Sequence, residues 1–254
     1  MSRLLAVAAN TFRETVRERV LYNLVFFAVL MTVAGLLLGQ LSIRQDEKIL
    51  KDIGLASMDL FGTLIAVFIG TGLVSKEIER RSLYPLLAKP LGRGEFFLGK
   101  FAGLAFTLLV NVGVMATGLA LTLLATGRRP DPALAGAVYP IFLGLLLVVA
   151  FAMLFSTQTS SALAAVLTVG VVIAGRFADV VRDMREVAPG VPRWASGALY
   201  AIIPNLRNFD FKDRVAYGEA VPAGVLAWVT AYGAAWIAIV LIVGLLSFRS
   251  RDFQ

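Results

Sequence analysis

Residues 134–155 read LAGAVYPIFLGLLLVVAFAMLF, and the part Leu143–Leu154 contains no polar side chain at all. A β-strand in a membrane barrel would alternate polar and apolar side chains, whereas this stretch is apolar on every face. A helix needs about 20 apolar residues to cross a hydrocarbon layer that is about 30 Å thick. The stretch therefore predicts a helix that crosses a membrane.

Similar apolar blocks recur along the chain, and 58% of its 254 residues are hydrophobic while 16% are charged. A soluble domain has about 45–50% and about 25%. We predict six crossings, at Val20–Leu41, Met58–Val74, Phe96–Ala125, Leu134–Phe155, Ala162–Gly175 and Ala223–Phe248. The fifth block is short and spans a bilayer only if its helix extends into residues 176–181. The predicted fold is an all-α integral membrane protein with one transmembrane domain over residues 1–254.

Cysteine and histidine are both absent from the chain. Their absence excludes disulfides, thiol redox chemistry, zinc sites and catalytic triads that use histidine. We therefore expect no catalytic residue, no metal site and no cofactor on this chain, and we expect that it is not an enzyme. The charges at Arg13, Glu14 and Arg17 precede the first apolar block, so no cleavable signal peptide is expected.

The distribution of Lys and Arg predicts the orientation of the crossings. Among the termini and short loops, one side of the predicted membrane carries twelve of these residues and the other carries five. The positive side faces the cytoplasm in most membrane proteins, so both termini should be cytoplasmic. The net charge of +7 is then a signal of topology, and we expect no nucleic-acid partner.

Two segments outside the blocks are expected to touch the membrane surface. Residues 1–19 place apolar side chains on one helical face and charges opposite, which predicts an interfacial helix. The apolar face comprises Leu4, Leu5, Val7, Ala8, Phe12 and Val16. Residues 176–222 alternate aromatic residues with turn formers and charges, so we expect an extracytoplasmic segment with short interfacial or re-entrant helices.

A third segment, residues 75–95, reads SKEIERRSLYPLLAKPLGRGE and is longer than a tight turn requires. Leu83, Leu86 and Leu87 lie at helical spacing, with Pro85 near the start and Pro90 behind them. This pattern predicts a short amphipathic helix in a cytoplasmic loop. A solvated connector is the alternative.

Glycine patterns near residue 100 permit two interpretations. Gly94, Gly99 and Lys100 form most of a phosphate-binding loop, but Phe101 stands where such a loop needs Ser or Thr. We therefore favour the start of a helix. Gly99 and Gly103 have the spacing that lets two helices approach closely, and the pair Gly35 and Gly39 has it too.

Two polar residues lie in or near the predicted crossings. A carboxylate in lipid is a functional candidate by default, which draws attention to Asp59. Asp59 falls at the outer end of the predicted second crossing, however, where water is close. Asn111 lies deeper, and a hydrogen bond between helices is its simplest role. We favour a structural role for both.

An intramembrane enzyme is one alternative function. It would use Asp59 with the outer carboxylates, because hard divalent cations need only oxygen ligands. Those carboxylates are Asp179, Asp183, Glu186, Asp210 and Asp213. The arginines between them favour a solvated surface instead.

Residues 76–101, KEIERRSLYPLLAKPLGRGEFFLGKF, resemble the coupling region of type-2 ATP-binding cassette (ABC) exporter permeases. The positions that match are Glu77, Glu79, Arg80, Ser82, Leu83, Leu86, Leu87, Pro90, Phe96, Gly99 and Lys100. Arg81 stands where many members have glycine, which points to a subgroup. Within the family the chain is most similar to NosY-like and multi-copper-enzyme-maturation permeases.

The resemblance implies a permease subunit of an ATP-driven exporter in the cytoplasmic (inner) membrane of a bacterium or archaeon. A separate cytoplasmic ATPase subunit would hold ATP and magnesium, and a second permease chain, identical or related, would complete the pore. The residues expected to contact the ATPase are Glu77, Glu79, Arg80, Arg81, Ser82, Leu83, Leu86, Leu87, Lys89 and Pro90. The alternative within this family is a mechanotransmitter that moves periplasmic partners through residues 176–222 without transport.

Overall fold

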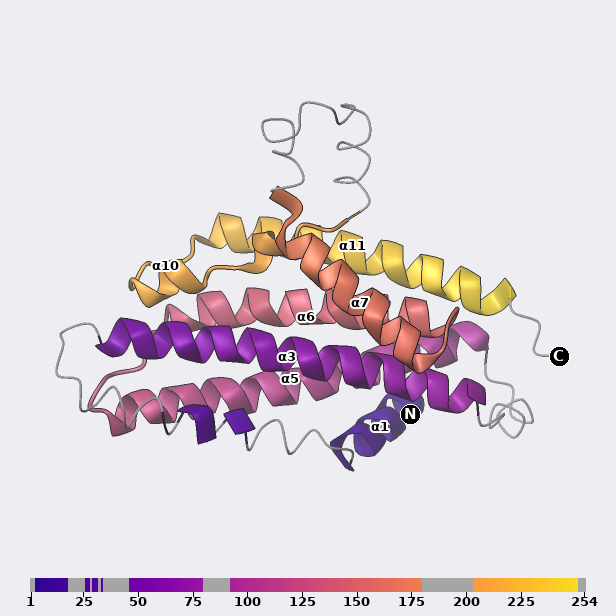
Figure 1. Ribbon diagram of the computed structural model, residues 1–254, viewed down its shortest axis with the longest axis horizontal. Coiled ribbons are helices and arrows are strands. Elements are labelled where there is room, and N and C mark those ends of the chain that lie inside the picture. The colour runs from indigo at the N-terminus through magenta and orange to yellow at the C-terminus, as the bar shows by residue number, and fades with distance from the viewer. Residues whose placement is uncertain are drawn as a thin grey trace.

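A computed structural model describes residues 3–17, most of 26–33, 46–79, 92–179 and 203–250. All regular structure in these ranges is helical, which confirms the predicted all-α membrane protein (Figure 1). The elements with described bounds are α1 (Arg3–Arg17), α3 (Asp46–Glu79), α5 (Arg93–Ala125), α6 (Leu134–Ser156), α7 (Ser161–Arg176), η1 (Leu206–Phe209), α10 (Lys212–Ala216) and α11 (Ala223–Ser250).

Four of the described helices are long and apolar enough to cross a membrane. Their apolar parts are Glu47–Gly72, Gly94–Ala125, Leu134–Ser156 and Ala223–Phe248. Figure 1 shows these helices running lengthwise beside one another, with α7 crossing them obliquely. Helix α6 contacts α3, α5, α7 and α11 and is the most buried of the four. Its apolar sequence on every face therefore matches a central position in the bundle.

The second predicted crossing begins earlier than expected, because α3 starts at Asp46 and not near Met58. Charged residues interrupt the hydropathy there, but the helical period of buried residues continues through Leu50, Gly54 and Met58. The charge of Lys51 is compensated, since its Nζ lies 2.7 Å from Glu47 Oε1 and 3.9 Å from Asp131 Oδ2. An amphipathic turn with paired charges thus extends the apolar helix.

The extension that the fifth predicted crossing would need stays a prediction, because residues 178 and 179 are helical again after a turn at Phe177 and residues 180 and 181 lie outside the described ranges. Helix α7 ends at Arg176 after 16 residues, which is about 24 Å and short of a 30 Å hydrocarbon layer. The helix stops where polar partners take over: Arg176 pairs with Asp59, and Asp179 two residues after the cap at Phe177 binds Asn205.

The first predicted crossing, Val20–Leu41, and the pair Gly35 and Gly39 lie largely or wholly outside the described residues. Of the described positions there, Phe27 and Met31 are buried, and the Phe26 ring meets Phe61 edge-on with 5.3 Å between ring centroids. This part of the chain therefore contributes to the same apolar core as α3.

Helix α1, the start of α5 and the end of α11 lie at one end of the bundle (Figure 1). The Phe248 ring of α11 lies 6.3 Å from that of Phe96 and 6.0 Å from that of Phe97. Val7 of α1 contacts Gly99 of α5 close by. The two ends of the described chain therefore lie at the same end of the bundle, and the cytoplasmic position of the termini stays a prediction.

Candidate functional site

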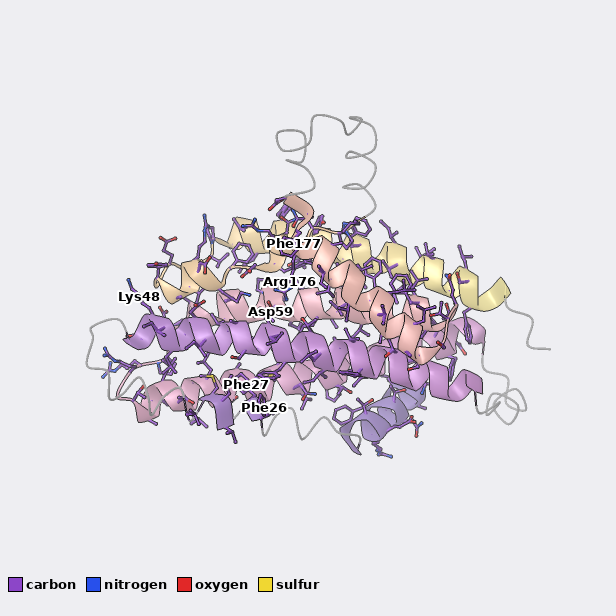
Figure 2. All side chains as sticks on the ribbon, viewed as in Figure 1. Phe26, Phe27, Lys48, Asp59, Arg176 and Phe177 are labelled. Carbon is purple, nitrogen blue, oxygen red and sulfur yellow. The ribbon has the colours of Figure 1, made fainter. Side chains whose placement is uncertain are left out.

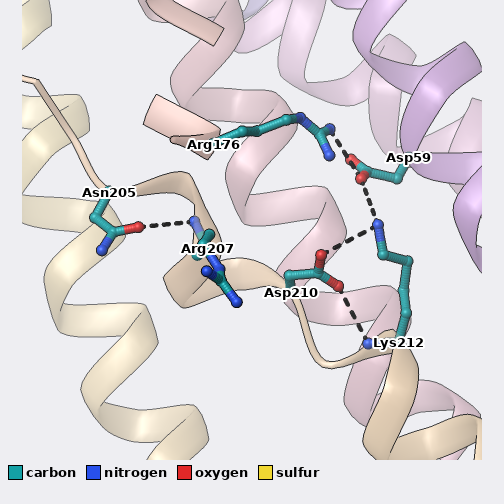
Figure 3. A network of polar contacts seen from close by, with 6 residues as sticks. All are labelled: Asp59, Arg176, Asn205, Arg207, Asp210 and Lys212. Atoms are coloured by element: carbon teal, nitrogen blue, oxygen red, sulfur yellow. Dashed lines mark hydrogen bonds and ion pairs between the residues drawn. The ribbon is translucent and has the colours of Figure 1, made fainter. Parts of the chain in front are cut away.

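A cluster of charged side chains joins three elements around Asp59 of α3 (Figure 3). Asp59 Oδ2 lies 2.8 Å from Arg176 Nη2 of α7 and 2.9 Å from Lys212 Nζ of α10. Lys212 Nζ also lies 3.3 Å from Asp210 Oδ2. One carboxylate oxygen thus receives two cations from segments more than 100 residues away along the chain.

Asp59 does not lie at the end of a helix, as the predicted crossing implied. It falls midway along the apolar range Glu47–Gly72, and Figure 2 places Asp59 and Arg176 near the middle of the bundle's length. Only 17% of its side chain is exposed. A carboxylate at such a depth must be paired, and the two cations provide that pairing.

Residues 203–216 enter the bundle and bring Lys212 to Asp59. Phe209 of η1 is buried and contacts Gly144 of α6 and Gly233 of α11. A Cβ atom at Gly233 would lie 3.1 Å from the Phe209 ring, so glycine makes room for this aromatic side chain. Both glycines lie well inside their helices, so residues 203–216 pack within the bundle. An extracytoplasmic position with interfacial or re-entrant helices stays a prediction.

Asn205 anchors the start of the same segment. Its backbone N–H donates to Tyr232 Oη of α11 at 2.8 Å. Its side-chain Nδ2 donates to Asp179 Oδ1 at 2.7 Å, while its Oδ1 accepts from the backbone N–H of Arg207 at 3.0 Å. Arg207 Nη1 lies 3.5 Å from Asp179 Oδ2. The segment is thus held at both ends, by Asn205 and by Lys212.

A cavity of about 320 Å³ lies against this cluster, between α3, α6, α7 and η1. Asp59, Arg176, Arg207 and Asp210 border it, together with an apolar wall. That wall comprises Ile141, Leu145, Val148, Val172, Leu206 and Phe209. The site therefore combines charged groups and apolar surface, as ligand pockets do.

Lys212 remains charged in this setting. Burial by itself would lower its pKa, but the adjacent Asp59 and Asp210 carboxylates outweigh that effect and raise the pKa above the ordinary 10.5. Lys212 is therefore a permanent cation near neutral pH, and the cluster keeps its ion pairs there.

Sequence reasoning found Asp59 but missed its partners. Arg176, Arg207 and Lys212 looked like ordinary surface charges in a polar segment. The available signal was Asp59 itself, because a buried carboxylate requires a cation and only a neighbouring segment can provide one. Asp183 and Glu186 lie outside the described residues. Within the part of the chain that the structure describes, no three acidic residues gather in a way that could hold a metal ion.

Helix α1 packs closely on α5 at the other end of the bundle. A Cβ atom at Gly99 would lie 2.8 Å from Val7 Cβ, and one at Gly103 would lie 2.7 Å from the Ala8 carbonyl oxygen. This contact confirms the close approach predicted for that glycine pair. Gly94 and Gly99 both lie inside α5, so the helix interpretation replaces the phosphate-loop one.

Charged residues of α1 take two different positions. Glu14 Oε2 lies 3.7 Å from Nζ of the buried Lys100, whereas Arg13 is exposed. The buried face of α1 includes Thr11 and Thr15, and Leu5 is exposed, so it differs from the apolar face expected from sequence. The helix itself is confirmed. Its position at the membrane surface stays a prediction, and so does any role of Arg17.

Asn111 bonds within its own helix. Its Nδ2 donates to the Thr107 carbonyl at 2.8 Å, and its buried Oδ1 has no hydrogen-bond partner among the described residues. The hydrogen bond between helices therefore stays a prediction.

The residues expected to contact an ATPase fall mostly outside the described ranges. Glu77 and Glu79 lie in the last turn of α3, where only the backbone is described. The other eight are Arg80, Arg81, Ser82, Leu83, Leu86, Leu87, Lys89 and Pro90, and they belong to residues 80–91. Their helical structure and their contacts remain predictions.

Comparison with known proteins gives one family. A family model described as ABC-2 family transporter protein matches residues 5–178. No curated protein matches the sequence. The matched range runs from α1 to just beyond α7, so it includes Asp59 and Arg176 but not residues 203–216.

Proposed function

The chain belongs to the ABC-2 transporter family, and on that premise we propose that it is the membrane-spanning permease subunit of an ATP-driven exporter. ATP and magnesium would be held by a separate cytoplasmic ATPase subunit, and two permease chains would form the transport path. The observation that carries this proposal is the family match over a bundle of four long apolar helices.

The arrangement at one end of the bundle supports a coupling role for residues 75–95. These residues run from the last turn of α3 to the first turn of α5, and α1 is packed onto the first turns of α5 at Gly99 and Gly103. A force applied to this loop would therefore reach α3, α5 and α1 together. This requires that both termini are cytoplasmic, which is the orientation that the Lys and Arg distribution predicts.

The first experiment identifies the partners. The full chain is purified from its native membranes in mild detergent, and every protein that elutes with it is identified by mass spectrometry. We expect an ABC ATPase among these proteins. The second permease should be either another copy of this chain or a related chain. Purified by itself, the chain should hydrolyse no ATP. Repeated purification without any ATPase, or ATP hydrolysis by the chain alone, would contradict the proposal.

A second experiment tests the coupling loop in the isolated complex. Replacing Leu83 and Leu86 by alanine removes apolar contact area expected at the ATPase, so ATPase recovery or its stimulation by the permease should fall severalfold. Leu121→Ala in α5 serves as the control, because Leu121 is exposed at the other end of the bundle. Equal recovery and equal stimulation in both variants would remove these leucines from the interface.

A further inference from the structure

We propose that the cavity between α3, α6, α7 and η1 binds an amphiphile with a phosphate headgroup, with the phosphate on Arg176 and Arg207 and the apolar chain along α6. The cavity is formed by this chain alone. The proposal therefore does not depend on the ATPase partner or on a second permease.

The size and lining of the cavity fit the headgroup of such a ligand and the adjoining part of its chain. Its volume of about 320 Å³ is at the lower end of the range of about 300–1,000 Å³ for small-molecule pockets. Ile141, Leu145 and Val148 lie on successive turns of α6 and offer a continuous apolar strip. At the other part of the site the lining contains Asp59, Arg176, Arg207 and Asp210, which Figure 3 shows on neighbouring elements. A ligand with one polar and one apolar part would match both.

The carboxylates beside the cavity are already paired, so its arginines are what it offers to a ligand. The two carboxylates in the lining, Asp59 and Asp210, are both paired with Lys212, which lies outside the lining. Arg176 and Arg207 in the lining equal these two carboxylates in number. Asp179, also outside the lining, lies 3.5 Å from Arg207 and accepts a hydrogen bond from Asn205. Three cations thus face three carboxylates in the whole cluster, and recognition of a phosphate rests on the guanidinium donors and not on an excess of positive charge.

Both guanidinium groups have donors to offer. A guanidinium carries five N–H donors in a planar fork that matches phosphate oxygens. The described ion pairs use one nitrogen of Arg176 and one of Arg207. The side chains are 40% and 61% exposed, so a headgroup can reach them without breaking the pair with Asp59. Arginine is the residue that suits bidentate phosphate contacts best.

The apolar part of the lining favours a lipid over a free phosphate ester. Val148 lies near the middle of α6, and Ile141 and Leu145 continue the same strip. A free phosphate ester has no chain to cover this strip, whereas a phospholipid does.

The test uses the purified full chain in detergent, with native mass spectrometry and thermal unfolding as two measurements. Three probes are added at equal concentration: phosphatidylglycerol, diacylglycerol with the same chains, and glycerol 3-phosphate. We expect phosphatidylglycerol to remain bound and to raise the unfolding temperature. Diacylglycerol lacks the phosphate and glycerol 3-phosphate lacks the chains, so both should bind at least about tenfold more weakly.

Matched arginine variants locate the binding. Arg207→Gln removes a guanidinium that borders the cavity, and affinity for phosphatidylglycerol should fall about tenfold. Arg214→Gln, in neighbouring α10 but away from the lining, should leave it unchanged. Val172→Trp should also reduce binding by filling the apolar part of the cavity.

Several outcomes would overturn the proposal. Equal affinity for diacylglycerol would mean that the phosphate is not recognised. Equal affinity for glycerol 3-phosphate would mean that the apolar wall takes no part. An unchanged affinity in both Arg207→Gln and Val172→Trp would place the lipid elsewhere on the protein surface. None of these results bears on ATPase recovery, so the permease proposal is tested separately.

Discussion

The two junctions that attach outlying segments to the bundle are built in opposite ways. Helix α1 meets α5 at Gly99 and Gly103, where backbone and side chains touch without intervening space. Residues 203–216 meet α3 through the ion pair of Lys212 with Asp59, which also pairs with Arg176 of α7, beside a cavity of about 320 Å³. A junction made by close packing has one arrangement, whereas one made by charges next to a cavity has room for a ligand. The difference indicates which junction is suited to mechanical coupling and which to binding.

The largest effect is expected at Asp59. Asp59→Asn leaves Arg176 and Lys212 without their shared carboxylate in a largely buried site, which should reduce the free energy of unfolding by about 3 kcal/mol. Thermal or denaturant unfolding in detergent measures this loss. Asp52→Asn, an exposed change in the same helix, is the control and should be close to neutral. A loss at Asp59 as small as at Asp52 would mean that water, and not the cations, satisfies this carboxylate.

The next prediction concerns the packed junction, which is the contact of α1 with α5 at Gly99 and Gly103. In Gly103→Ala the new Cβ atom would lie 2.6 Å from Thr11 Cβ, so α1 must shift, with a loss of about 2 kcal/mol. Because the chain has no cysteine, a single Thr11→Cys reporter can be introduced at this fully buried position. Maleimide labelling of that cysteine should become faster in Gly103→Ala.

Gly113→Ala provides the matched control for the packed junction. Gly113 lies in the same helix, and a Cβ atom added to it would have no neighbouring atom of the described residues within 4 Å, so alanine fits there. Labelling at residue 11 should stay slow in this variant. If both glycine variants label at the same rate, α1 is not held by close packing at Gly103.

The sequence predicted the elements whose cause is local. A run without polar side chains has one stable form in a membrane, which is why α5, α6 and α11 appear close to their expected bounds. The spacing of Gly99 and Gly103 likewise predicted a helix contact that the structure contains. These features depend on a single helix and its nearest neighbour.

The sequence predicted much less where the cause is distant. The start of α3 was placed too late because Lys51 looks solvated until Glu47 and Asp131 are seen beside it. The pairing of Asp59 with Lys212 joins residues 153 positions apart, and no local pattern indicates it. The cavity depends on three helices and η1 together, so only the tertiary structure reveals it.

A smaller effect is expected on the pH dependence of stability at the charged junction, which is the ion-pair cluster of Asp59, Arg176 and Lys212. Since the pKa of Lys212 is raised above 10.5, the folded protein holds this proton more tightly than the unfolded chain does. The stabilisation by Lys212 is therefore fully present below pH 10.5 and is lost as pH rises through the folded pKa. The free energies of unfolding of the parent protein and of Lys212→Gln should differ by a constant amount between pH 7 and pH 9. At higher pH the two curves should converge, and convergence already at pH 8 would contradict the assignment.

The smallest effect is expected for an exposed pair at the start of α3. Arg128 Nη1 lies 3.9 Å from Glu47 Oε2, and both side chains are more than one-third exposed. Such a pair contributes little in water, so Arg128→Gln should change the free energy of unfolding by less than about 0.5 kcal/mol. A loss comparable to that in Asp59→Asn would show that distance and exposure do not separate the two kinds of ion pair.

The unbroken length of α3 has a geometric consequence. This single helix of 34 residues contains both Asp59, at the charged junction, and Glu79, where residues 80–91 begin. The two residues are about 30 Å apart along the axis at about 1.5 Å per residue. If α3 pivots at Asp59 as a rigid rod, a tilt of about 5° displaces its Glu79 end by about 2.6 Å. A ligand in the cavity beside Asp59 that tilted α3 in this way would therefore move the start of residues 80–91 relative to the rest of the bundle.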